Sequence, residues 1–172
     1  MMKYILFIIL SLIMVGYLLY QSKEDIKDKT VPVLPNYIAI GVSAILYFIG
    51  CLCTWSIPDI KGIFTVIFFL ACICFFKVFS IGDAKAFLAI SFISAFTIKQ
   101  NMIFHAKLDL FFIELVYIFA MIFFIPVNVI KSRKSGMKWK DILYGKNPIA
   151  FFPYITIGYI CASVFCIKFS YI

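Results

Sequence analysis

Apolar residues fall into long uninterrupted runs along this chain, and the charged residues gather in short stretches between them. The apolar runs cover residues 4–20, 33–53, 62–76, 86–98, 110–130 and 148–167, and the only charged residue within them is Glu114. A helix of about 20 apolar residues is long enough to cross the hydrocarbon of a bilayer. The third and fourth runs reach 18 and 17 residues when they are extended to residue 79 and back to residue 82. The pattern therefore predicts six transmembrane helices, with a tight turn at residues 80–82 joining the middle two.

The composition excludes an ordinary soluble domain. Of 172 residues, 65% are hydrophobic and only 14% are charged, whereas soluble domains are about 45–50% apolar and about 25% charged. We therefore predict an all-α, polytopic membrane protein with a single domain of residues 1–172. No small-x-small cleavage site follows the first run, so we expect a retained helix and not a signal peptide.

The basic residues predict how the chain is oriented. With the N-terminus outside, the inner loops hold eleven Lys and Arg residues and the outer segments hold five. Basic loops stay on the cytoplasmic side of a membrane, so we predict that the N-terminus and the C-terminus are both outside. Residues 21–32, 80–85 and 131–147 then face the cytoplasm from a cell membrane. The basic residues that give the net charge of +8 lie in short loops between apolar runs, which is typical of a membrane protein and not of a nucleic-acid-binding protein. Residues 131–147 could bind anionic headgroups.

The sequence gives little support for a metal site or a cofactor site. The six cysteines lie within or beside apolar runs, at positions 51, 53, 72, 74, 161 and 166. A zinc site needs cysteine or histidine ligands gathered in one place, and the single histidine, His105, is in a predicted outer loop. That position also excludes a Ser/His/Asp triad at the cytoplasmic face, and no phosphate-binding glycine motif occurs. We predict no metal and no cofactor.

Two stretches place carboxylates at the predicted cytoplasmic edge of the membrane. Residues 25–32 read Asp-Ile-Lys-Asp-Lys-Thr-Val-Pro, and residues 80–85 read Ser-Ile-Gly-Asp-Ala-Lys. An ionisable residue at membrane depth indicates a functional site with a partner, and Asp25 is the partner that we expect for Asp83. Such a pair can hydrolyse an amide, because one carboxylate takes a proton from water while the other donates a proton to the carbonyl oxygen. Since close like charges cannot both ionise easily, the pair titrates as a unit.

These two stretches, with Ile-Ala-Phe-Phe-Pro-Tyr-Ile-Thr-Ile-Gly at residues 149–158, resemble the type IV prepilin peptidase family. That family carries an Asp-hydrophobe-x4-hydrophobe-Pro motif after one helix and Gly-x-Gly-Asp-x-Lys between two later ones. The resemblance covers essentially the whole chain and implies that Asp25 and Asp83 are catalytic. It implies an aspartic endopeptidase that removes a short basic leader from pilin-like or archaellin-like precursors. The cysteine-bearing cytoplasmic insertion of larger members is missing, which implies a peptidase without N-methyltransferase activity.

The sequence departs from the family pattern at two positions. Ser80 stands where the family has its first motif glycine, and Val33 stands where the family often has Asn or Asp. The motif can also be aligned to start at Asp28, and Asn36 then stands at the position where the family often has Asn or Asp. This alignment also places a lysine where the family has an apolar residue, so we favour Asp25.

The same residues also have structural interpretations. Asp83 is a preferred residue type for a helix N-cap, while Asp25 and Asp28 could belong to a solvated polar loop. Lys85 could extend to water or pair with Asp83. The remaining polar candidates are expected at the outer interface: His105, Asp109 and Glu114. The alternative function is a non-catalytic membrane component, a scaffold or a small transporter, of a pilus or secretion system.

Overall fold

The computed structural model describes the backbone of residues 2–28, 32–75, 80–96, 104, 106–135 and 150–169. Side chains are described in these ranges except at residues 2–5, 28, 131–135 and 169. All regular structure within the described ranges is helical, and they contain no β-strand. The predicted all-α fold is confirmed.

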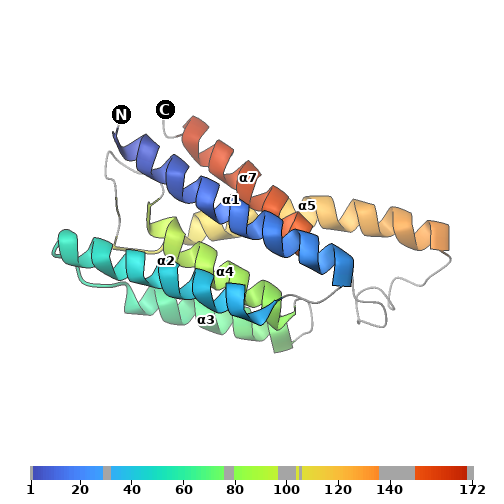
Figure 1. Cartoon of the computed structure of the whole chain (residues 1–172), viewed down its shortest axis with the longest axis horizontal. Coiled ribbons are helices and arrows are strands. Elements are labelled where there is room, and N and C mark those ends of the chain that lie inside the picture. The colour runs from blue at the N-terminus through green and yellow to red at the C-terminus, as the bar shows by residue number, and fades with distance from the viewer. Residues whose placement is uncertain are drawn as a thin grey trace.

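The described residues form six α-helices and one 3-10 helix (Figure 1). In chain order they are α1 (Met2–Asp28), α2 (Val33–Cys53), α3 (Ile60–Phe75), α4 (Ile81–Ile93), η1 (Ser94–Phe96), α5 (Leu110–Ser135) and α7 (Phe152–Phe169).

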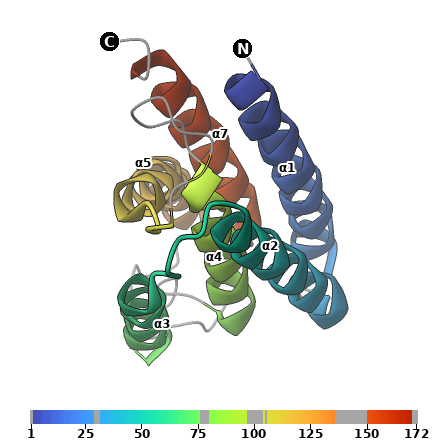
Figure 2. The ribbon, with the colours of Figure 1, turned by 90° about the vertical axis from the view of Figure 1, so that its left-hand side faces the viewer.

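The helices pack in two groups that meet at α4. Helices α1 and α5 each pack against α7, and α2 and α3 each pack against α4 (Figures 1 and 2). Helix α4 also contacts α1 and α5 and so joins the two groups. Consecutive helices run in opposite directions, so the start of α1 and the end of α7 lie at one end of the bundle, here called the near end (Figure 1). At the far end, α1 ends and α4 and α7 begin.

Three helices are long and apolar enough to cross a membrane, judged by length and composition. They contain the segments Leu6–Lys27, Val33–Cys53 and Leu110–Ile130. The segments Ile60–Phe75 and Phe152–Lys168 are apolar but shorter, and α4 has only 13 residues. Large apolar side chains are widely exposed on the bundle, for example Leu52 at 75% and Phe68 at 72%. Such a surface suits lipid contact, and the apolar helices indicate a membrane protein.

Helix α4 is the central element of the packing. From residue 86 to residue 93 every side chain except Leu88 is buried. A helix that is apolar on all sides needs neighbours on all sides, and here α1, α2, α3 and α5 supply them. This position carries the first turn of α4, with Asp83, into the interior of the bundle.

Helix α1 corrects the prediction that residues 21–32 form a polar loop. The helix continues to Asp28, because Gln, Lys and Glu are good helix formers and because one face of this segment is buried. Leu18, Gln21, Ser22 and Asp25 are all buried, at the spacing of one helical face. The extra turns bring Asp25 into the bundle.

Other predicted boundaries also shift. The predicted turn at 80–82 is the start of a helix, because Ser80 caps α4 and residues 81 and 82 are already helical. The predicted fourth span stops earlier as an α-helix, at Ile93, and continues as η1 to Phe96. Helix α5 runs on to Ser135, into the segment predicted as a basic loop. Residues 136–147 of that segment lie outside the described residues.

Gly158 allows α7 to pack directly on the backbone of α5. A Cβ at this position would lie 2.8 Å from the main-chain nitrogen of Ala120 and would also meet the carbonyl oxygen of Val116. We expect Gly158→Ala to lower the free energy of unfolding by about 1–3 kcal/mol, the usual cost of overpacking. Unfolding of the purified protein in detergent would measure this loss. Gly41→Ala is the control, since a Cβ there has nothing within 4 Å; equal losses in both variants would contradict the close contact.

Candidate active site

Asp83 lies in the first turn of α4 and is held there by a capping box. The backbone N–H and the hydroxyl of Ser80 both donate to Asp83 Oδ2, at 2.9 and 2.7 Å. In return, the Asp83 backbone N–H donates to Ser80 Oγ at 3.2 Å. A carboxylate in the first helical turn also interacts favourably with the helix dipole. The side chain is only 4% exposed.

The capping box corrects one structural prediction and explains one departure from the family pattern. Asp83 is the third helical residue, and the N-cap of α4 is Ser80. A serine followed three residues later by an acidic residue is the sequence signature of this motif, so the signal was present in residues 80–83. Ser80 therefore has a local role of its own, since its hydroxyl bonds to the carboxylate.

Asp25 lies near the end of α1 and connects this helix to the start of α7. Its Oδ2 accepts a hydrogen bond from the backbone N–H of Phe152, the first residue of α7, at 3.1 Å. The side chain is 6% exposed, so the interpretation of Asp25 as part of a solvated loop is wrong. Helix α7 begins here because Asp25 satisfies one of the N–H groups that a helix start leaves without an intrahelical partner.

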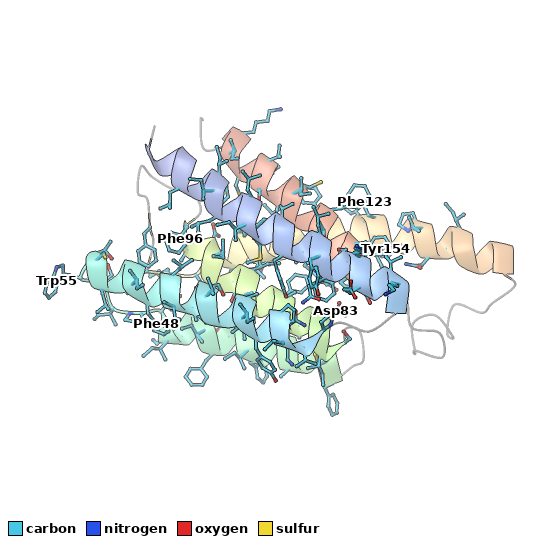
Figure 3. The ribbon with its side chains drawn as sticks, in the orientation of Figure 1. Phe48, Trp55, Asp83, Phe96, Phe123 and Tyr154 are labelled. Carbon is cyan, nitrogen blue, oxygen red and sulfur yellow. The ribbon has the colours of Figure 1, made fainter. Side chains whose placement is uncertain are left out.

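The fold brings the two carboxylates into one buried region at the far end. Helix α1 contacts α4, and Asp25 and Asp83 are both buried on these helices, 6% and 4% exposed. Figure 3 shows Asp83 in the part of the bundle away from the chain termini, where α1 passes over α4. Two carboxylates from separate helices therefore share an interior site.

A cluster of polar side chains, two of them buried and one half-buried, lies on α1 and α2 and was not predicted. Tyr17 OH and Gln21 Nε2 both donate to Asn36 Oδ1 of α2, the latter at 3.0 Å. Tyr17 is also close enough to Asp83 for an electrostatic interaction. Tyr17, Gln21 and Asp25 are spaced four residues apart and so follow one face of α1. The four-residue spacing is visible in the sequence. It places the three side chains on one face only because the helix continues through residues 21–28.

A second polar contact joins α1 to α7 next to Asp25. The hydroxyls of Ser22 and Thr156 lie 2.8 Å apart, and each also lies within hydrogen-bonding distance of a carbonyl in its own helix, Leu18 and Phe152 respectively. One hydroxyl donates to the other, and the second donates to its own carbonyl. In an apolar environment, such hydroxyl pairs hold helices together. The pair keeps α7 in register with the last turns of α1.

The other predicted polar residues lie elsewhere or outside the description. Lys85 Nζ lies 4.0 Å from the ring centre of Tyr37, an exposed aromatic residue. Asp109 lies at the near end and caps α5, since its Oδ1 accepts from Phe112 N–H at 3.2 Å. His105 and the side chain of Asp28 lie outside the described residues, so the register that starts at Asp28 stays a prediction.

A cavity of about 130 Å³ opens between α3, α4 and α5. Its lining is mostly apolar and includes Phe87 and Glu114. Neither Asp25 nor Asp83 contributes to it. The carboxylate pair, and not this cavity, is therefore the candidate active site.

Within the described ranges, no group of three or more His, Cys, Asp and Glu side chains comes together to hold a metal ion. The six cysteines are free thiols. At the far end, Asp25 and Asp83 offer two carboxyl groups for acid–base chemistry, and the amides and hydroxyls near them offer hydrogen bonds.

Comparison with protein-family models, with curated proteins and with solved structures found no match to this chain. The resemblance described above therefore rests on the three sequence segments that carry it.

The capping box gives a prediction about Ser80. We expect Ser80→Ala to lower the free energy of unfolding by about 1 kcal/mol, the usual loss on removing an N-cap side chain, and Ser80→Gly by only a few tenths. Glycine loses less because it adopts the backbone conformation of a cap easily. Chemical unfolding in detergent would measure both. Ser43→Ala serves as the control, because Ser43 is buried but bonds only within its own helix, to Ile40 O at 3.0 Å. A Ser80→Ala variant as stable as the wild type would contradict the capping role.

Proposed function

We propose that this protein is an aspartic endopeptidase at the membrane edge, with Asp25 and Asp83 as its catalytic pair. It removes the short basic leader from pilin-like or archaellin-like precursors at the cytoplasmic face of the cell membrane. The proposal includes six transmembrane helices with both termini outside.

One observation carries the proposal: two carboxylates, from segments distant in the sequence, are both buried on helices α1 and α4, which contact each other. Burying one such charge costs free energy, and a second nearby charge of the same sign adds to that cost. A structural role alone would favour moving the carboxylates apart. Sharing one proton removes the repulsion and gives an acid and a base in the same site.

Each carboxyl has a defined part in the reaction. The ionised one takes a proton from water as the water oxygen bonds to the scissile carbonyl carbon, and the protonated one donates to the carbonyl oxygen. The tetrahedral intermediate then collapses, and the amine leaves with the proton that the first carboxyl received. Ser80 and the Phe152 N–H hold the two side chains in place during these steps.

The position of the pair fits a substrate with an apolar helix that follows its leader. A peptide bond just before such a helix lies at the membrane edge when the helix is in lipid. The start of α4 and the last turn of α1, which hold the pair, are where apolar runs meet polar sequence. The basic segment 131–147 would repel a basic leader and is better suited to anionic lipid.

A non-catalytic component of a pilus or secretion system is the second candidate, and the hydrogen bonds favour it. Both carboxylates accept bonds from the start of a helix: Asp83 at α4 and Asp25 at α7. A protein that only needed stable helix starts could keep both residues for that reason. A peptidase needs carboxyl groups that gain and lose a proton, whereas a non-catalytic component needs only their hydrogen-bond acceptors.

Asparagine substitutions separate the two candidates. In Asp25→Asn and Asp83→Asn the side-chain oxygen can still accept the capping hydrogen bond, but proton transfer is lost. We expect each variant to fold and to cleave a co-expressed prepilin-like substrate at least about a hundredfold more slowly, the range for loss of general acid–base catalysis. The shift in substrate mobility on a gel measures cleavage.

Asp109→Asn is the matched control, because Asp109 is 6% exposed and also caps a helix, but at the near end. It should cleave at the wild-type rate. Full cleavage by the Asp25→Asn and Asp83→Asn variants would favour the non-catalytic component.

The proposed orientation has its own test. In a chain whose native cysteines are replaced, Ile57→Cys and Ile81→Cys introduce thiols at positions that are 85% and 71% exposed. A membrane-impermeant maleimide added to intact cells should label residue 57 and should label residue 81 only after permeabilisation. The reverse pattern would show that the chain is inserted the other way round.

A further inference from the structure

The amide of Gln21 is buried at the far end, and its carbonyl oxygen has no hydrogen-bond donor among the described residues. The side chain is 0% exposed. Its Nε2 donates to Asn36 Oδ1 at 3.0 Å, but its Oε1 has no hydrogen-bond partner among the described residues. A buried acceptor without a donor costs free energy, so the burial of Gln21 Oε1 needs an explanation.

Asn36 fixes the direction of this amide. Its Oδ1 accepts from Tyr17 as well as from Gln21, and two donors fill the two lone pairs of a carbonyl oxygen. Because an amide group is planar, anchoring Nε2 also fixes Oε1. Tyr17 and Asn36 thus hold Gln21 in one orientation.

The position of Gln21 relative to the carboxylates follows from its place on α1. It lies one helical turn before Asp25, where Cβ atoms are about 6 Å apart, and one turn after Tyr17. Gln21 is therefore the middle member of a row of three side chains on one face of α1, and α1 contacts α4, the helix that carries Asp83.

We propose that Gln21 Oε1 positions the attacking water between Asp25 and Asp83, with Asn36 and Tyr17 as the residues that orient Gln21. This inference rests on the proposed peptidase function. A hydrolytic water has two protons. One moves to the ionised carboxylate as the water oxygen bonds to the scissile carbon, and the other stays on that oxygen and donates a hydrogen bond to Gln21 Oε1. A carbonyl oxygen suits this role because it accepts a hydrogen bond without competing for the proton.

Gln21→Met tests the proposal, because methionine has a similar length and no acceptor of comparable strength. We expect kcat to fall about tenfold to a hundredfold, as for a misplaced reacting group, while KM stays within about twofold of the wild type. Cleavage of a prepilin-like reporter by the purified full chain in detergent gives both constants. Gln21→Asn keeps the amide, but its side chain is shorter by one methylene. Its kcat should lie between that of the wild type and that of Gln21→Met. That variant carries the test if Gln21→Met does not fold.

Ser11→Ala is the control on the same helix. Ser11 is buried and accepts a hydrogen bond from Tyr159, but ten residues of helix place it about 15 Å from Gln21. Its kcat should equal that of the wild type. The proposal fails if Gln21→Met keeps the wild-type kcat, or raises KM alone, while Asp25→Asn and Asp83→Asn are inactive. If those aspartate variants still cleave, the proposed function itself fails.

Discussion

Two buried carboxylates need hydrogen-bond donors, and this need organises the far end of the bundle. An unpartnered charge in the interior is too costly to keep, and each carboxylate here is met by the start of a helix. Asp83 accepts from Ser80, which begins α4, and Asp25 accepts from Phe152, which begins α7. These bonds fix where α4 and α7 start relative to α1, so three helices converge on one polar site in an apolar protein.

Capping and catalysis are compatible on the same side chain. A carboxylate offers about four lone-pair sites, and both hydrogen bonds from Ser80 go to Oδ2 of Asp83. The caps hold the side chains in fixed orientations, which is what a reacting pair requires. The near end uses the same device for a different purpose: Asp59 accepts from Gly62 N–H at 2.9 Å and from Leu108 N–H at 3.2 Å, and so ties two connections together.

A capping carboxylate alone therefore does not mark an active site in this fold. The far end differs because two such carboxylates are buried on contacting helices and because an oriented amide, that of Gln21, lies one helical turn from Asp25. Tyr17 and Asn36 contribute no acid or base in the proposed reaction, but they fix the amide of Gln21. The site is thus a set of groups from α1, α2, α4 and α7, and removing any one helix would leave buried polar groups unsatisfied.

The sequence by itself determined the fold class, because 65% hydrophobic residues in long uncharged runs leave few structures other than apolar helices. It also singled out Asp83, since a short carboxylate beside an apolar run stands out against its surroundings. Asp25 lies in a charged stretch, and the family resemblance favoured it over Asp28 as the partner. The end of α1 was missed because residues 21–28 are polar by composition, and their helical face is buried only when α4 and α7 pack on it. Gln21 and Asn36 were missed for the same reason: their hydrogen bond joins two helices. Local pattern predicts which segments are helical, but only tertiary packing decides which polar side chains are removed from water and so must find one another.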